Sequence, residues 1–253
     1  MPISFPKKPG LVIYITAGDP DLATTRDIAL AAIDNGADVI ELGVPFSDPL
    51  ADGPVIQRAS ERAVARGVRL TDVLAIAKDL RAARPNCGLV LFSYLNPVVR
   101  LGMEKFCAAA AEAGADGVLL TDMIVEEAGE YLESMRAHQL APIFLAAPTS
   151  PDARLKAIAA VSQGFVYAIS RVGITGTQQQ VASDASHLVG RLRQFTKLPI
   201  AVGFGISNAD HVKSVGKFAD AAIIGSALVA LIEKTPPNEA ATAVGNFIAG
   251  LRA

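Results

Sequence analysis

The sequence predicts an α/β protein that folds as a single (β/α)8 barrel, and three observations support this. Short apolar runs alternate with amphipathic segments eight times along the chain, which is typical of parallel strands joined by helices. The runs carry apolar residues on both faces, as in a sheet covered on both sides. The 253 residues show no break in composition, so we expect one catalytic domain over residues 1–253. The main rival, a doubly wound open sheet, would usually contain fewer units.

The strands are predicted from their apolar runs, several of which repeat a loose theme, as in GADVIEL, GADGVLL and FADAAII. We interpret this theme as the periodicity of the fold and not as a solenoid repeat. The eight strands are expected at Leu11–Ala17, Asp38–Val44, Gly88–Tyr94, Asp116–Thr121, Pro142–Ala146, Phe165–Ser170, Pro199–Val202 and Asp220–Ile224.

The segments between the strands are predicted as helices because apolar residues recur at three- and four-residue spacing. Gly36 stops the first helix, and Pro151 stands in the first turn of another, where its missing N–H does no harm. The helices are expected at Asp21–Asn35, Val55–Ala65, Thr71–Ala83, Gly102–Ala113, Val125–His138, Pro151–Ala160, Asp184–Phe195, Asn208–Val215, Ser226–Ile232 and Asn238–Leu251.

The composition excludes several classes of protein. Hydrophobic residues make up 51% and charged residues 19%, which favours a compact enzyme-like body. The net charge of -2 does not indicate a basic surface for binding nucleic acid. No apolar run is long enough to span a membrane. The first ten residues, MPISFPKKPG, lack the apolar segment that a signal peptide contains. Two unclustered cysteines, Cys87 and Cys107, form neither a zinc motif nor a disulfide framework, so we expect a reducing cytoplasm.

Catalysis in such a barrel takes place at the C-terminal ends of the strands, and the residue types there narrow the chemistry. No strand end carries a lysine, which excludes a Schiff base. His138, His187 and His211 fall in helices or at their edges, without the spacing of metal ligands, and His138 is expected to cap a helix or lie at the surface. Carboxylates, tyrosines and backbone groups remain.

Glu41 is the most unusual residue of the stretch Asp38–Pro54, DVIELGVPFSDPLADGP. A carboxylate inside a buried strand is costly unless it is paired or used. The stretch alone leaves two interpretations open, a structural residue with a partner in the core and an acid or base at a site past the strand end. If Ile40 and Leu42 face the helices, Glu41 faces the barrel, where burial raises its pKa and suits it to donate a proton near neutral pH.

The loop after this strand carries two further carboxylates. Asp52 is presented by a loop that prolines stiffen, and we expect it to take part in the site. For Asp48, just before Pro49, ordinary turn chemistry is the preferred interpretation. Three of the tyrosines, Tyr14, Tyr94 and Tyr167, lie in strands and are either core aromatics or the walls of a pocket for a flat apolar ligand with a polar rim.

The last quarter of the chain predicts a phosphate site. Strand seven runs into Gly203-Phe204-Gly205 and strand eight into Gly225-Ser226, with the short helix Ser226–Ile232 beginning there and Ser226 as its cap. Glycines let backbone N–H groups approach an anion, and these two loops form the usual phosphate site of a barrel. Ordinary glycine turns are the alternative interpretation. Arg171 either balances the anion's charge or braces its own loop.

These motifs resemble the tryptophan synthase alpha subunit family. The resemblance is carried by YITAGDP, ELGVPFSDPLADGP, GFVYAISRVGITG, VGFGIS and IIGSA, in this order between Leu11 and Leu251. It implies a (β/α)8 barrel lyase that cleaves indole-3-glycerol phosphate to indole and glyceraldehyde 3-phosphate in tryptophan biosynthesis. It also implies no cofactor in this chain and a beta subunit as partner in an alpha2beta2 complex, with pyridoxal phosphate only in the beta subunit.

The resemblance further implies roles for particular residues. Glu41 and Asp52 would be the catalytic carboxylates, with Glu41 delivering a proton to indole C3 and Asp52 holding the indole N–H. Tyr167 would be the active-site tyrosine, and Tyr14, Phe92 and Tyr94 would line the indole pocket. The phosphate would contact Gly176, Gly203, Phe204, Gly205, Gly225 and Ser226.

Two departures from the family pattern and three alternatives stay open. The segment before strand one is short and proline-bearing, so the family's N-terminal helix is expected to be short or missing. Ile124 stands where the family commonly has proline, which bears on coupling to the beta subunit. The alternatives are a free-standing lyase, a weakly catalytic barrel that activates its partner, and a different phosphate-binding barrel such as an isomerase. Intact Glu41 and Asp52 argue against the second, and the Glu41 loop argues against the third.

Overall fold

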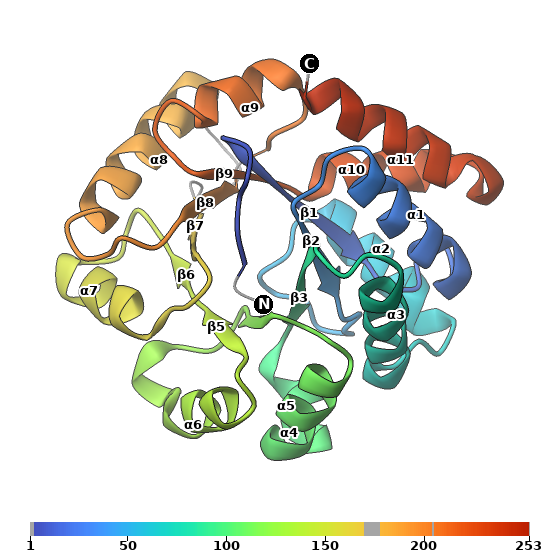
Figure 1. Cartoon of the computed structure of the whole chain (residues 1–253), viewed down its shortest axis with the longest axis horizontal. Helices are drawn as coiled ribbons and strands as arrows, with labels where there is room; N and C mark the ends of the chain where they lie inside the picture. Colours follow the sequence, from blue (N-terminus) through green and yellow to red (C-terminus); the bar gives the residue numbers. More distant parts are fainter. Residues whose placement is uncertain (1–2, 170–177, 204, 253) are drawn as a thin grey trace.

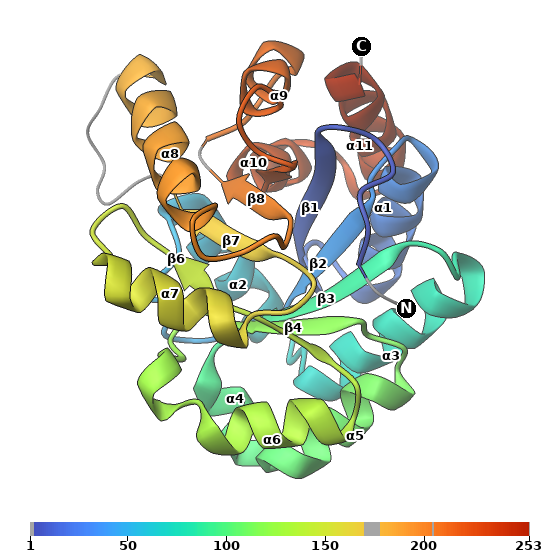
Figure 2. The ribbon, with the colours of Figure 1, turned by 60° about the vertical axis from the view of Figure 1, so that its left-hand side comes forward.

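The computed structural model describes residues 3–169, 178–203 and 205–252, with only the backbone described at 178–182. Its strands form one parallel sheet of nine strands in the order β5-β4-β3-β2-β1-β9-β8-β7-β6. The strands make an inner ring inside an outer layer of helices (Figure 1 and Figure 2). The strands are β1 (Gly10–Thr16), β2 (Val39–Gly43), β3 (Gly88–Ser93), β4 (Gly117–Leu120), β5 (Ala141–Ile143), β6 (Leu145–Ala146), β7 (Val166–Ile169), β8 (Ile200–Gly203) and β9 (Ala221–Ile224).

The ring closes through one continuous stretch of chain. The two ends of the strand order, β5 and β6, are separated only by Phe144, and the Phe144 carbonyl accepts the N–H of Tyr167 on β7 at 3.1 Å. These two strands together are the predicted fifth strand, so the (β/α)8 barrel is confirmed. On the opposite side of the ring, β1 pairs with β9, and the first and last helices lie side by side.

The helices follow the predicted alternation with a few differences. Leu95–Leu101 is a helix that the sequence reading missed because Asn96-Pro97 resembles a turn; Pro97 lies in its first turn, where the backbone N–H has no helical partner. The predicted helix Val125–His138 divides into a 3-10 turn, Val125–Glu127, and a helix. The helices are α1 (Leu22–Asp34), α2 (Pro54–Ala65), α3 (Leu70–Ala83), α4 (Leu95–Leu101), α5 (Met103–Glu112), α6 (Gly129–Ala137), α7 (Asp152–Val161), α8 (Gln178–Leu192), α9 (Ala209–Val215), α10 (Ser226–Lys234) and α11 (Pro237–Arg252).

Strand alternation divides the core into two parts. Ile13, Ile40 and their equivalents pack outward against the helices, whereas Val12, Val39 and their equivalents fill the barrel. The segment before β1 also packs into this inner core through Ile3 and Phe5, and Figure 1 shows it crossing the middle of the ring. Residues 3–9, the described part of that segment, contain no helix, as expected from its prolines. No helix of the described residues is long and apolar enough to span a membrane.

The repeated theme at the strand starts has a physical cause. The aspartate that precedes β2, β4 or β9 accepts a backbone N–H from a neighbouring strand and pairs with an arginine in the last turn of a helix or, for Arg193, directly after a helix. The three sets are Asp38 with Leu11 and Arg252, Asp116 with Leu89 and Arg81, and Asp220 with Ile200 and Arg193. These ties lie at the end of the barrel opposite the strand C-termini. Residues at that end of a barrel usually serve stability and not catalysis.

Candidate active site

A cavity of about 400 Å³ lies at the C-terminal ends of the strands. It brings together most of the predicted site residues that the structure describes. Those that line it are Tyr14, Asp52, Phe92, Tyr167, Gly203, Gly205, Gly225 and Ser226. Glu41 and Tyr94 are buried outside this lining. Arg171, Gly176 and Phe204 lie outside the described residues, so their predicted roles are untested.

Glu41 is fully buried in β2, opposite Tyr14 of β1 and Val90 of β3. Neither of its carboxyl oxygens has a hydrogen-bond partner among the described residues. Within the described residues, the structure therefore contradicts the interpretation of Glu41 as a structural residue with a partner in the core. Burial raises the pKa of Glu41 to about 8, because a charged carboxylate would lose its hydration without compensation. The structure thus holds a carboxylic acid that keeps its proton at neutral pH.

Asp52 is held by a tyrosine from another strand end. The Tyr94 hydroxyl donates a hydrogen bond to Asp52 Oδ2 at 3.0 Å and accepts the backbone N–H of Ala51 at 2.9 Å. Burial raises the pKa of Asp52 to about 6, and the hydrogen bond from Tyr94 opposes this rise. Asp52 is consequently the stronger acid of the two carboxyl groups. Tyr94, predicted in the indole pocket, does not line this cavity itself; its hydroxyl contacts Ala51 and Asp52, which do.

Two glycines make room for the other two tyrosines. A Cβ at Gly43 would lie 2.3 Å from the Tyr14 hydroxyl, and a Cβ at Gly203 would lie 2.9 Å from the Tyr167 hydroxyl. Any side chain there would displace a ring from the barrel mouth. The sequence reading missed Gly43, although a glycine inside an apolar strand signals such a close approach. Tyr14 also packs edge-on against Phe92, with ring centroids 5.0 Å apart, which builds an aromatic wall.

Glycine backbone forms another part of the cavity lining. Gly203 ends β8 and Gly205 follows with φ +47°, a left-handed conformation that glycine adopts without strain. Gly225 is the N-cap of α10 and Ser226 its first residue, so the prediction of Ser226 as the cap is wrong by one position. The free N–H groups and the dipole at the N-terminus of a helix favour a bound anion. The N-terminus of α10 lines the cavity through Gly225 and Ser226.

The other candidates lie in local structure. The Asp48 carboxylate accepts the hydroxyl of Ser47 at 2.6 Å in an exposed turn, as preferred from the sequence. His138 is the C-cap of α6 and contacts Glu104 at 2.7 Å, which confirms its predicted place. Among the described residues, no group of three or more His, Cys, Asp and Glu side chains is placed to hold a metal ion. Cys87 and Cys107 are buried free thiols.

Comparison with known proteins gives a consistent result. The family described as "Tryptophan synthase alpha chain" matches residues 3–249. The tryptophan synthase alpha chain of Burkholderia lata is 49% identical over 96% of this chain and 90% of its own length, and that of Cupriavidus taiwanensis is 48% identical over 97% and 93%. Among solved structures, a chain of the tryptophan synthase a2b2 complex of Pyrococcus furiosus superposes with a TM-score of 0.91 at 39% identity, over 97% of this chain and 98% of that one. A chain of ligand-free tryptophan synthase from M. tuberculosis gives 0.87 at 35% identity, over 97% and 94%.

Proposed function

The chain belongs to the tryptophan synthase alpha chain family, and on this premise we propose that it cleaves indole-3-glycerol phosphate to indole and glyceraldehyde 3-phosphate in tryptophan biosynthesis. The reaction is a retro-aldol cleavage by a carbon–carbon lyase, and we assign the whole of 1–253 to one catalytic domain. The observation that carries the proposal is Glu41, a fully buried carboxylic acid without a partner among the described residues. It stands beside a cavity whose lining includes aromatic rings and glycine backbone.

The proposed chemistry divides between the two carboxyl groups. Protonated Glu41 first gives its proton to indole C3, and the Glu41 carboxylate formed in this way then accepts the proton of the hydroxyl on the adjoining glycerol carbon. The bond between those two carbons then breaks, its electrons return to the indole ring, and the former alcohol carbon leaves as an aldehyde. Ionised Asp52 accepts the indole N–H and stabilises the positive charge that forms when C3 is protonated. The ring takes up the electrons, so the chain requires neither a lysine nor a cofactor.

The substrate's two ends match the two sides of the cavity. The indole would lie against the wall formed by Tyr14 and Phe92, within reach of Asp52, and Tyr167 would stand beside the glycerol chain. The phosphate would accept backbone N–H groups around Gly203, Gly205 and the start of α10. Arg171, Gly176 and Phe204 belong to the same proposal as substrate-binding residues, on the family resemblance alone.

A beta subunit is the proposed partner. The solved relatives include tryptophan synthase complexes, among them the a2b2 complex of Pyrococcus furiosus. We therefore expect this chain to form an alpha2beta2 assembly in the cytoplasm, with pyridoxal phosphate bound only by the beta subunit. Exposed Leu50, in the loop that presents Asp52, suits a contact that would order this loop.

The test is an assay of indole release from indole-3-glycerol phosphate, with and without the beta subunit of the same organism. We expect slow release by the chain alone and acceleration by the beta subunit. A fast rate that is indifferent to the beta subunit would instead identify a free-standing lyase. Absence of indole under both conditions, from protein whose circular dichroism shows it folded, would contradict the proposed function.

A further inference from the structure

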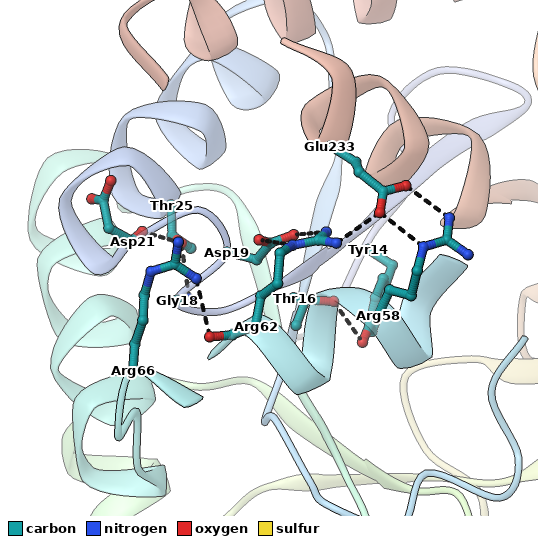
Figure 3. Close-up of polar contacts among 10 residues, drawn as sticks. All are labelled: Tyr14, Thr16, Gly18, Asp19, Asp21, Thr25, Arg58, Arg62, Arg66 and Glu233. Atoms are coloured by element: carbon teal, nitrogen blue, oxygen red, sulfur yellow. Dashed lines mark hydrogen bonds and ion pairs between the residues drawn. The ribbon is translucent and has the colours of Figure 1, made fainter. Parts of the chain in front are cut away.

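A charged cluster lies behind the wall of the cavity, on the outer side of β1, α2 and α10. Three of its members come from three separate parts of the chain: Asp19 from the loop after β1, Arg62 from α2 and Glu233 from α10. Figure 3 shows the guanidinium of Arg62 between the two carboxylates. We call these three residues the clamp. None of them lines the cavity, so the proposed chemistry does not use them directly.

The geometry of the clamp is specific. Arg62 donates two parallel hydrogen bonds to Asp19, from Nε to Oδ1 at 2.8 Å and from Nη2 to Oδ2 at 2.7 Å. Its remaining nitrogen, Nη1, donates to Glu233 Oε1 at 2.7 Å. A planar guanidinium that uses all three nitrogens at once fixes the relative position of its partners, which a flexible ammonium group would not.

The clamp is better sheltered than an ordinary surface ion pair. The side chain of Asp19 is 4% exposed, that of Glu233 23% and that of Arg62 30%. Arg58 also donates to Glu233, and hydrogen bonds from Arg58 and Arg62 lower the pKa of Glu233 to about 2. The carboxylate therefore stays charged throughout the range in which the enzyme would work. Sheltered, bidentate pairs of this kind resist solvent screening more than exposed ones do.

The elements that the clamp joins are the ones that carry the two ends of the site. The helix α2 starts directly after Asp52-Gly53, and α10 starts at Ser226 beside Gly225. Between clamp and cavity, Ala59 of α2 and Val229 of α10 pack with Tyr14 of β1 in one small apolar cluster. The distance between the acid side and the anion side of the cavity is thus set by how α2 and α10 pack, and Arg62 ties them together at the back.

We propose that Arg62 is a positioning residue which, through Asp19 and Glu233, holds α2 and α10 at the separation that a substrate spanning the cavity requires. This inference rests on the proposed function, because it takes the ligand to have an aromatic end at Asp52 and a phosphate end at α10. A ligand that touches only one side does not sense the separation. A ligand that touches both sides loses affinity when the separation is no longer fixed.

The experiment compares one ligand that spans the cavity with two that do not. The spanning ligand is a stable indole-alkyl phosphate with the length of the substrate, and the short ligands are inorganic phosphate and indole. Their dissociation constants are measured by calorimetry or NMR titration on the full chain, as wild type, Arg62→Gln, Glu233→Gln and Lys78→Gln. Glu233→Gln leaves the Asp19–Arg62 pair intact, so it tests the α2–α10 link if Arg62→Gln fails to fold around the buried Asp19.

We expect Glu233→Gln and Arg62→Gln to bind the spanning ligand about 10-fold more weakly, with less than about 2-fold change for inorganic phosphate and indole. Lys78→Gln is the matched control: it removes an exposed ion pair between Lys78 of α3 and Glu112 of α5 and leaves the α2–α10 link intact, so all three affinities should stay unchanged. Equal weakening of all ligands, or wild-type affinity for the spanning ligand in Glu233→Gln, would overturn the inference alone. Failure of the wild type itself to bind the spanning ligand would overturn the proposed function, and the inference with it.

Discussion

At the scale of single residues, Glu41 links stability to function. A carboxyl group whose folded pKa is raised binds its proton more tightly in the folded chain than in the unfolded one. Its contribution to stability is therefore complete below the ordinary pKa of 4.5 and is lost as the pH rises towards the folded pKa of about 8. Retaining such a group lowers stability at neutral pH, which a purely structural residue would not do.

The prediction concerns Glu41→Gln, whose side chain does not titrate. The free energy of unfolding of the variant minus that of the wild type should rise by about 3 kcal/mol between pH 4 and pH 7, since 1.36 kcal/mol corresponds to each pH unit in this window. Urea denaturation of both proteins at a series of pH values measures this difference. A difference that does not change with pH would show that Glu41 is not buried as an acid.

Tyr94 gives a second prediction, because its hydroxyl favours the charged form of Asp52. Tyr94→Phe removes that hydrogen bond, so the pKa of Asp52 should rise above its present value of about 6. If Asp52 must be ionised, the acid limb of the pH–rate profile should move to higher pH, and kcat at pH 7 should fall about 10-fold. Phe92→Leu, which alters an aromatic wall without touching Asp52, is the control. An unmoved acid limb in Tyr94→Phe would exclude the positioning role of Tyr94.

Some residue roles were within reach of the sequence and others were not. Glu41 was predicted as a site residue because burying a single carboxylate in an otherwise apolar strand costs free energy unless the group is paired or has a function. Asp52 followed from its place after that strand. The bond from Tyr94 to Asp52 joins residues 42 positions apart, and that from Arg62 to Glu233 spans 171 positions. No local pattern reports such pairings, which only the packed barrel creates.

At the scale of elements, strands were easier to predict than the caps and turns around them. Apolar runs mark buried strands directly, whereas α4 was missed because Pro97 reads as a turn and yet fits a first helical turn. The Asp–Arg ties at the strand starts explain why the theme GADVIEL recurs. The aspartate accepts a strand N–H that the ladder leaves open and pairs with an arginine from another part of the chain.

These ties predict an effect on stability without an effect on catalysis. Asp116→Ala should lower the free energy of unfolding by about 3 kcal/mol, because the 5% exposed carboxylate binds Arg81 and the N–H of Leu89. The tie lies at the far end of the barrel, so kcat at 20 °C should stay within about 2-fold of wild type. Lys78→Ala, which removes an exposed ion pair with Glu112, should cost less than about 0.5 kcal/mol. Denaturant midpoints measure both, and a loss of kcat at unchanged stability would contradict this assignment.

At the scale of the whole molecule, the barrel assembles one site from distant parts of the sequence. Parallel strands of a closed ring deliver all their C-terminal ends to one face, which is why the order of the strands predicted that Asp52 and Gly225 would meet around one cavity. The packing of Ile3 and Phe5 into the inner core of the barrel was not predicted, because the sequence of a short extended segment does not indicate where it packs.

Coupling to the partner also belongs to this scale. If contact with the beta subunit orders the loops at the cavity mouth, the partner should raise the lyase rate by shifting the chain towards its closed state. Ile124 is exposed in the loop after β4. Its φ of −96° lies outside the range of about −65 ± 15° that proline allows. We expect Ile124→Pro to strengthen coupling, because proline leaves the loop less conformational freedom to lose on docking, and this gain requires a local backbone shift. Titrating beta subunit against the rates of wild type and Ile124→Pro measures it, and a weaker activation in the variant would show that the shift is not tolerated.

The central claim is that Glu41 acts as a proton donor beside an ionised Asp52, and the pH dependence of kcat/KM for indole-3-glycerol phosphate tests it most directly. The rate should rise with pH through about 6 as Asp52 ionises and fall through about 8 as Glu41 loses its proton. Glu41→Gln should bind substrate, lose roughly 10²–10⁴-fold in kcat and no longer show the alkaline limb. A wild-type profile that stays flat from pH 6 to pH 9, or an alkaline limb that survives in Glu41→Gln, would contradict the account.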